Sequence, residues 1–172
     1  FQKRLRPSNL RAGVQAMDAY PSPDGHYAAS SYTDGSILIW NLLTDQVVTT
    51  LTGHKGPATS VAISPDGKWL ASAGNDGEIL LWAMNKILQP SVQAQPYLRL
   101  EGHTGRIHSV RFDPDSQRVI TASVDGTVRI FPVTPEEYLQ EAKAMMKYRP
   151  DHPYLERPRK SNESPRKSNE RK

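Results

Sequence analysis

With 172 residues the chain accommodates one domain of ordinary size, and the absence of cysteine excludes disulfide bonds, thiolate catalysis and thiolate zinc sites. No segment approaches the run of about 20 apolar residues that a membrane helix needs, so a membrane-spanning function is excluded. The net charge of +4 comes entirely from residues 149–172, with 8 basic against 4 acidic side chains, and the balanced remainder disfavours nucleic-acid binding by anything except this tail.

Residues 1–12 read as a linker or as the remnant of a preceding unit. Three similar units follow over residues 13–133, with boundaries at 13–51, 52–100 and 101–133. Each contains a Pro-Asp turn and then an Asp-Gly turn followed by an apolar run that ends in Trp40, Trp82 or Phe131. Trp40 and Trp82 are 42 positions apart, while Trp82 and Phe131 are 49 apart because extra residues lie within 84–96. A period in the low forties predicts a repeat architecture.

Each unit is predicted to form short antiparallel strands. In the second unit these are residues 59–63, 68–73 and 79–82, which are rich in β-branched and apolar residues and separated by turn sequences. Residues 46–51 and 97–100 supply a fourth strand to the first and second units, and residues 84–96 are predicted as a loop. Because one small sheet cannot bury both its faces, we expect the units to stack against each other around an axis.

Two Gly-His pairs, Gly53-His54 and Gly102-His103, precede the second and third units. Together with the Asp-Gly turns and the terminal aromatic residues, they make the chain similar to the WD-repeat (WD40-type) family over about 119 of its 172 residues. The resemblance implies an all-β fold, a partial β-propeller of about three four-stranded antiparallel blades. It also implies a non-catalytic scaffold that recruits protein or peptide partners, in the cytoplasm, or also in the nucleus if the source is eukaryotic.

The sequence departs from the family pattern at several positions. No unit has Asp after its aromatic residue, since Asn41, Ala83 and Pro132 stand there. Arg11-Ala12 takes the place of Gly-His in the first unit.

The resemblance further implies a buried hydrogen-bonded network of His, Ser or Thr, Asp and Trp in each unit. Its members are His54, Ser72, Asp76 and Trp82 in the second unit, His103, Thr121 and Asp125 in the third, and Ser30, Asp34 and Trp40 in the first. A hydrolase built on Ser72 is the competing interpretation, and it is disfavoured because a nucleophile needs exposure and oxyanion donors. No catalytic residue is therefore assigned. The five histidines lack ligand spacing, so no metal and no cofactor is expected.

Partner binding in this family usually occurs at the end of the blades where the His and Asp loops emerge. By alignment the candidate partner-binding residues are Met17, Thr59, Asn75, Arg106 and His108. Arg106 with His108 is suited to an acidic peptide.

The third unit has no fourth strand of its own, so it resembles a last blade, and the remaining blades are expected upstream. The first unit is then expected to expose an apolar face. Residues 134–148 are predicted to form a helix, with Thr134 as its cap, and residues 149–172 a disordered basic tail. Two alternatives remain for the function: the regulatory part of a larger signalling enzyme with an ATPase or protease-like module upstream, and weak nucleic-acid association through the tail.

Overall fold

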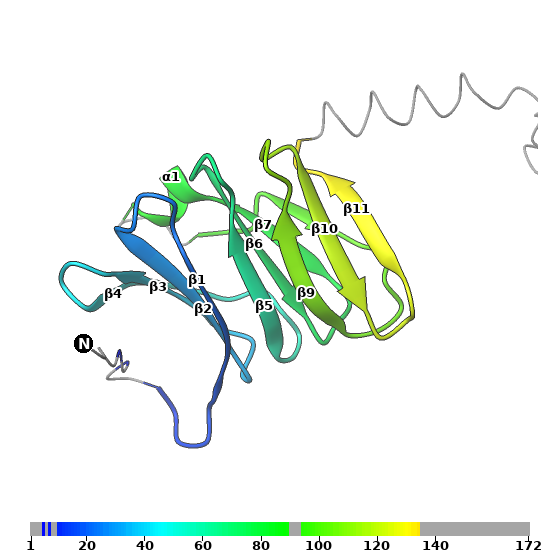
Figure 1. The fold of residues 1–172 in the computed structure, drawn as a ribbon. Helices are drawn as coiled ribbons and strands as arrows, with labels where there is room; N and C mark the ends of the chain where they lie inside the picture. The colour runs from blue at the N-terminus through cyan, green and yellow to red at the C-terminus, as the bar shows by residue number, and fades with distance from the viewer. Residues whose placement is uncertain (1–4, 6, 8–9, 90–93, 135–172) are drawn as a thin grey trace, which may run out of the picture. The chain divides into compact units, whose positions relative to one another are not determined.

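The structure is a computed structural model that describes Leu5, Pro7 and residues 10–89 and 94–134 (Figure 1). This part of the chain forms three antiparallel sheets. The helix predicted for residues 134–148 lies outside the described residues apart from Thr134, as does the whole tail over residues 149–172. Within the described ranges no helix is long and apolar enough to cross a membrane.

Each sheet consists of strands that follow one another in the sequence and pair in that order, and we call the sheets the first, second and third blades. The first blade contains β1 (Ala16–Pro21), β2 (Tyr27–Tyr32), β3 (Ile37–Asn41) and β4 (Gln46–Leu51). The second contains β5 (Ala58–Ile63), β6 (Trp69–Gly74), β7 (Ile79–Ala83) and β8 (Leu98–Leu100). The third contains β9 (Ile107–Phe112), β10 (Arg118–Ser123) and β11 (Val128–Pro132), so within the described residues it is one strand shorter. The strands predicted from the sequence lie within one residue of these bounds.

Strands β1, β5 and β9 lie side by side, one from each blade (Figure 1). Ser60 on β5 donates its hydroxyl hydrogen to Asp18 on β1 at 2.8 Å, and Thr59 on β5 donates to the backbone oxygen of Ile107 on β9. Since residues near the beginning of each strand are joined, all three strands begin at the same end of the molecule. This shared end carries the candidate partner-binding residues.

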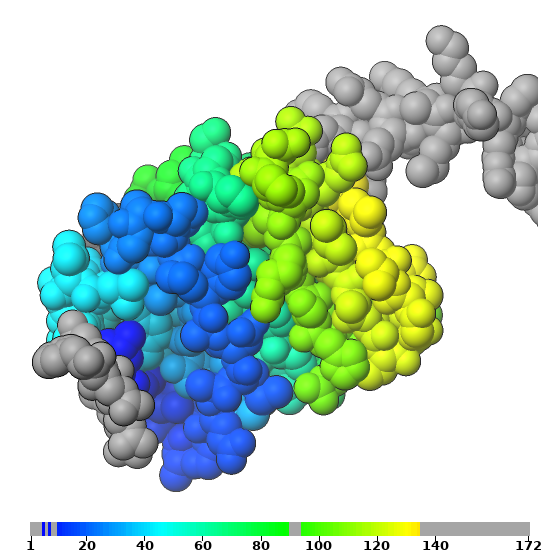
Figure 2. Space-filling model, in the orientation of Figure 1, coloured from blue at the N-terminus to red at the C-terminus, as the bar shows by residue number. Residues whose placement is uncertain are grey.

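Apolar side chains on both faces of the second blade form the core. Leu80 and Trp82 on β7 pack with Ile37 of the first blade. Ile79 and Leu81 point to the opposite face, as alternate residues of a strand must, and pack against the third blade. The side chains of the three blades are in contact along the face seen in Figure 2. The stacking of separate sheets predicted from the repeat is therefore confirmed.

The outer face of the third blade has no covering layer within the described residues. Val128 and Ile130 on β11 are 69% and 59% exposed, and Ile120 beside them on β10 is 38% exposed. Val128 and Ile130 occupy the positions of Ile79 and Leu81 in the second blade, which are fully buried. The difference arises because the third blade covers the second, and no described blade covers the third.

The first blade does not expose an apolar face, and the expectation that it would is wrong. Tyr32, Leu38 and Trp40 on its outer face are each at most 4% exposed. Residues from the segment before β1 pack against them, namely Leu5, Leu10 and Val14. This segment thus occupies the place that a preceding blade occupies for the second and third blades.

The segment between β7 and β8 was predicted as a loop, but the structure shows that part of it is helical. It begins with a short helix, α1 (Met84–Ile87), placed directly after β7. Met84 and Ile87 are buried in the core between the first and second blades. The added residues therefore contribute apolar side chains to the core.

Candidate functional site

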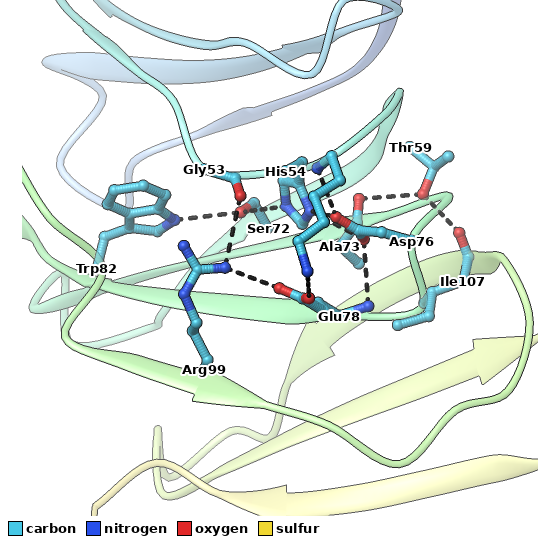
Figure 3. A network of polar contacts seen from close by, with 11 residues as sticks. Gly53, His54, Thr59, Ser72, Ala73, Asp76, Glu78, Trp82, Arg99 and Ile107 are labelled. Carbon is cyan, nitrogen blue, oxygen red and sulfur yellow. Dashed lines mark hydrogen bonds and ion pairs between the residues drawn. The ribbon is translucent and has the colours of Figure 1, made fainter.

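The second blade joins the four residues of its predicted network in one chain of hydrogen bonds (Figure 3). His54 Nδ1 lies 3.1 Å from both carboxylate oxygens of Asp76, and its Nε2 lies 3.0 Å from Ser72 Oγ. The indole Nε1 of Trp82 donates to the same hydroxyl oxygen at 3.1 Å. The imidazole is completely enclosed by protein.

Hydrogen-bond chemistry assigns each proton of this network. An ionised carboxylate only accepts, so His54 Nδ1 carries a hydrogen and donates it to Asp76. The Ser72 hydroxyl then accepts from Trp82 and donates its own hydrogen to the bare Nε2. With a neutral imidazole, every polar atom of these four side chains has a hydrogen-bond partner, so their burial carries little free-energy cost.

The carboxylate of Asp76 is held in its ionised form. Burial raises the pKa of Asp76, but hydrogen bonds from His54, from the Lys55 backbone N–H at 2.9 Å and from the Glu78 backbone N–H at 3.2 Å outweigh it and lower this pKa to about 2. Glu78 also forms an ion pair with Arg99 at 2.7 Å (Figure 3) and another with Lys55 at 3.2 Å. These contacts fix the loop that carries His54 against the turn that carries Asp76.

The third blade repeats the network without an indole. His103 Nδ1 lies 2.8 Å from Asp125, and its Nε2 lies 2.7 Å from the hydroxyl of Thr121. The Thr127 hydroxyl and His103 both donate to Asp125 and hold the pKa of that carboxyl well below its usual range. Phe131 meets the imidazole of His103 edge to face, with ring centroids 6.3 Å apart. An aromatic contact thus replaces the donor that Trp82 supplies in the second blade.

The first blade has no histidine at this place, and a tyrosine that the sequence analysis did not identify bonds to the serine instead. Trp40 Nε1 donates to Ser30 Oγ at 2.7 Å, and Ser30 in turn donates to the hydroxyl of Tyr32 at 3.3 Å. Tyr32 aligns with Gly74, where a Cβ atom would lie only 2.5 Å from His54 Nδ1. The Tyr32 ring therefore takes the space that an imidazole takes in the second blade. A large residue aligned with a glycine, in the one unit without histidine, was the available signal.

Asp34 is not part of a network. It is exposed, and its Oδ1 accepts from the backbone N–H and the hydroxyl of Ser36 at 3.0 and 2.6 Å. The structure brings together Ser30 and Trp40 but leaves Asp34 apart from them, because no histidine links the turn to the strand.

Ser72 is not arranged as a nucleophile. Its residue is completely buried, and its hydroxyl already bonds to Trp82 and His54. A substrate has no approach to this oxygen, so the resemblance of the network to a catalytic triad is one of composition alone. Within the described ranges, no group of three or more His, Cys, Asp or Glu side chains could hold a metal ion.

Three equivalent backbone hydrogen bonds build the end of the blades where β1, β5 and β9 begin. They join Thr33 N to Gln15 O at 3.0 Å, Asn75 N to Pro57 O at 2.9 Å and Val124 N to Arg106 O at 2.9 Å. Each bond ties the residue before a turn Asp to the segment entering the inner strand of the same blade. Four of the candidate partner-binding residues lie on this end and are exposed: Met17, Asn75, Arg106 and His108. We call these four residues the rim.

Thr59 does not belong to the rim, contrary to the sequence-based expectation. Only 7% of it is exposed, and its hydroxyl hydrogen is directed to the backbone oxygens of Ala73 and Ile107. Residue alignment placed Thr59 beside Met17 and His108, and all three residues stand at an equivalent register shift of their inner strands. Strand β5 differs because it has an inner strand on each side, β1 and β9, and the Thr59 hydroxyl bonds to the backbone of β9. Thr59 therefore links the second blade to the third.

The sequence matches the family model described as WD domain, G-beta repeat, three times, over residues 6–41, 45–83 and 94–131. The chain belongs to the WD40 repeat family. No curated protein sequence matches it significantly. Solved structures that resemble it include the WD40 repeats of RRP9 and the structure of U3-55K, both with a TM-score of 0.65 and 23% identity over 75% of this chain. The chain spans 37% and 38% of the length of those two structures.

The matched WD40 repeats are offset from the blades. The match over residues 45–83 begins with β4, the outer strand of the first blade, and ends with β7 of the second. The matches over residues 45–83 and 94–131 thus each contribute strands to two neighbouring blades, which ties the blades together through the backbone as well as through the core.

A second polar contact between the WD40 blades also escaped the sequence reasoning. Arg111 on β9 donates through Nη1 to Ser60 Oγ at 3.2 Å and to the Val61 backbone oxygen at 3.4 Å. The same nitrogen lies 3.7 Å from Asp18, and the guanidinium lies 5.5 Å from the ring centroid of Tyr20. One side chain therefore connects all three blades along their inner strands. A single arginine in a strand gave no sequence signal for this role.

Proposed function

We propose that this WD40 chain is a non-catalytic scaffold that binds a partner protein or peptide at the rim formed by Met17, Asn75, Arg106 and His108. The WD40 fold supports the general class, because members of the family typically serve protein interaction. The choice of the rim rests on the side chains that the structure leaves available there.

The main support is the state of Arg106. Its side chain is exposed and takes part in no hydrogen bond or ion pair within the part of the chain that the structure describes. A guanidinium group carries five N–H donors in a planar fork that matches a carboxylate, so a free arginine at a surface suits an acidic partner residue. His108, at the beginning of β9 and two residues after Arg106, supplies a second polar side chain.

Apolar surface lies on the same end of the blades. Met17 is 39% exposed and Val124 is 56% exposed. Methionine adapts its shape to different apolar partners. The ligand that fits this combination is a peptide segment with an acidic residue next to an apolar one.

The rim is attached to a rigid base. The inner strands that carry Met17 and His108 are joined through Thr59, Ser60 and Arg111. A binding surface that is already ordered loses little conformational entropy when a partner binds.

The test is a crosslinking pull-down that compares the unchanged chain with the variant Arg106→Ala/His108→Ala. The control variant is Arg118→Ala, which removes one positive charge at the opposite end of β10. We expect the double variant to lose partners that the control retains. Identical partners for all three proteins would refute the rim as the binding site.

A further inference from the structure

A pocket of about 330 Å³ opens beside the first blade, at the turn that carries Asp34. Its walls include apolar, hydroxyl and charged side chains, namely Leu10, Arg11, Asp34, Leu38, Thr50 and Thr52. Asp34 follows Thr33, whose backbone bonds to Gln15, so the pocket lies at the same end of the blades as the rim. It extends outward from there to β4.

The equivalent aspartates of the other blades are fully occupied by the chain itself. Asp76 Oδ2 accepts from the imidazole of His54 and from the backbone N–H of Lys55 at 2.9 Å. Asp125 Oδ2 accepts from His103 and from the backbone N–H of Thr104 at 3.1 Å. Both aspartate side chains are only 8% exposed.

Asp34 differs from them at one oxygen atom. Both bonds from Ser36 go to Oδ1, and Oδ2 receives no donor from any residue that the structure describes. Ala12 stands where the other units have histidine, and Tyr32 fills the space of the imidazole. The equivalent Oδ2 atom receives two N–H donors in each of the other blades. Asp34 Oδ2 receives none from the residues that the structure describes.

We propose that this pocket binds a basic side chain of a partner peptide, with Asp34 Oδ2 as the acceptor. An arginine or lysine supplies the N–H donors that histidine and a backbone amide supply elsewhere in the chain. Its aliphatic stem packs on Leu10, which is partly exposed at the pocket wall, as long charged side chains do on apolar surfaces. Thr50 and Thr52 offer hydroxyl groups to the peptide backbone.

Arg11 on the pocket wall restricts the choice of ligand. Arg11 forms no ion pair with Asp34 within 4.0 Å, so the pocket holds separate positive and negative groups. A run of basic residues would meet repulsion from Arg11. The favoured ligand is a basic residue beside an acidic one. This inference deepens the proposed function because it assumes a peptide partner, but it uses side chains outside the rim.

The test is a titration of the ¹⁵N-labelled 172-residue chain with the peptide acetyl-Gly-Leu-Arg-Glu-Gly-amide, followed by NMR. We expect saturable shifts of the backbone signals of Asp34, Ser36 and Thr50. Asp34→Asn keeps the shape of the turn and removes the charge, and it should weaken binding about tenfold, which corresponds to about 1.4 kcal/mol. The matched control is Asp24→Asn, an exposed turn aspartate elsewhere in the first blade, which should leave the affinity unchanged.

A second peptide, with Gln in place of Arg, should bind the unchanged chain about tenfold more weakly and should bind Asp34→Asn with no further loss. Absence of saturable shifts, equal binding of both peptides, or shifts confined to the rim would overturn the pocket as a site for a basic side chain. The variant Arg106→Ala/His108→Ala should bind the first peptide normally. A failed pocket with an intact rim, or the reverse, therefore separates this inference from the proposed function.

Discussion

Replacing His54 with alanine tests whether the polar network of the second blade stabilises the fold. The imidazole is completely buried and makes its bonds to Asp76 and Ser72 at 3.0–3.1 Å. After its removal Asp76 keeps two backbone donors and Ser72 still accepts from Trp82, while the Ser72 hydroxyl hydrogen loses its acceptor. The cost is therefore that of two lost hydrogen bonds, and not that of an orphaned charge.

The size of the effect follows from these bonds. A bond to an ionised group contributes about 1.5–3 kcal/mol and a bond between neutral groups about 1 kcal/mol, and the remaining donors to Asp76 favour the lower end. We expect His54→Ala to lower the free energy of unfolding by about 2.5 kcal/mol.

Urea denaturation of the full chain at pH 7, followed by tryptophan fluorescence, measures this change. The control is His26→Ala, because the His26 side chain is 59% exposed and lies 3.4 Å from an equally exposed Asp24. We expect no measurable shift of the midpoint in the control. If both variants unfolded at the same urea concentration as the unchanged chain, the network would not stabilise the fold and our reasoning would be refuted.

Three further predictions concern the same blades. Gly74→Ala places a Cβ atom 2.5 Å from His54 Nδ1 and should destabilise the chain by about 2 kcal/mol or more in the same assay. The control Gly56→Ala should not destabilise it, because the nearest atom to the added Cβ is 3.9 Å away. Equal effects of the two substitutions would contradict the tight fit at Gly74. Ser31 has a buried hydroxyl with no hydrogen-bond partner among the residues that the structure describes, so Ser31→Ala should raise the free energy of unfolding by about 1 kcal/mol. A loss of stability would show a bond to that hydroxyl. The pKa of Asp76 is about 2 in the folded chain against an ordinary 3.8, so the contribution of this carboxylate to stability is present above pH 3.8 and is lost as the pH falls toward 2. Over this pH range the urea midpoint should fall less steeply for Asp76→Asn than for the unchanged chain.

The network of the second blade was implied by the resemblance to the WD-repeat family, and its members could be located because they stand in local units. His54, Ser72, Asp76 and Trp82 recur at fixed positions relative to turns, and turns are set by a few neighbouring residues. The strands between them follow from β-branched and apolar runs. What the alignment did not show was that Tyr32 replaces the imidazole in the first blade, because two residues that occupy the same space need not align with each other.

Thr59 shows a different limit. The repeat placed it correctly at the beginning of an inner strand, but its burial depends on the neighbouring strand β9, where its hydroxyl bonds to the backbone oxygen of Ile107. Exposure is a property of packing between blades. Sequence position within one unit therefore does not determine which residue of an inner strand faces solvent and which joins two blades.

The sequence by itself determined the number of units, their strands, their turns and the polar residues that recur in them, because each of these depends on residues close together in the chain. Only the tertiary structure decided which apolar faces are covered. Leu38 and Trp40 are buried by a segment from before the first strand, while Val128 and Ile130 are exposed although they belong to the same pattern. The physical reason is that burial of a sheet face depends on what packs against it, and that is set by contacts between residues far apart in the chain.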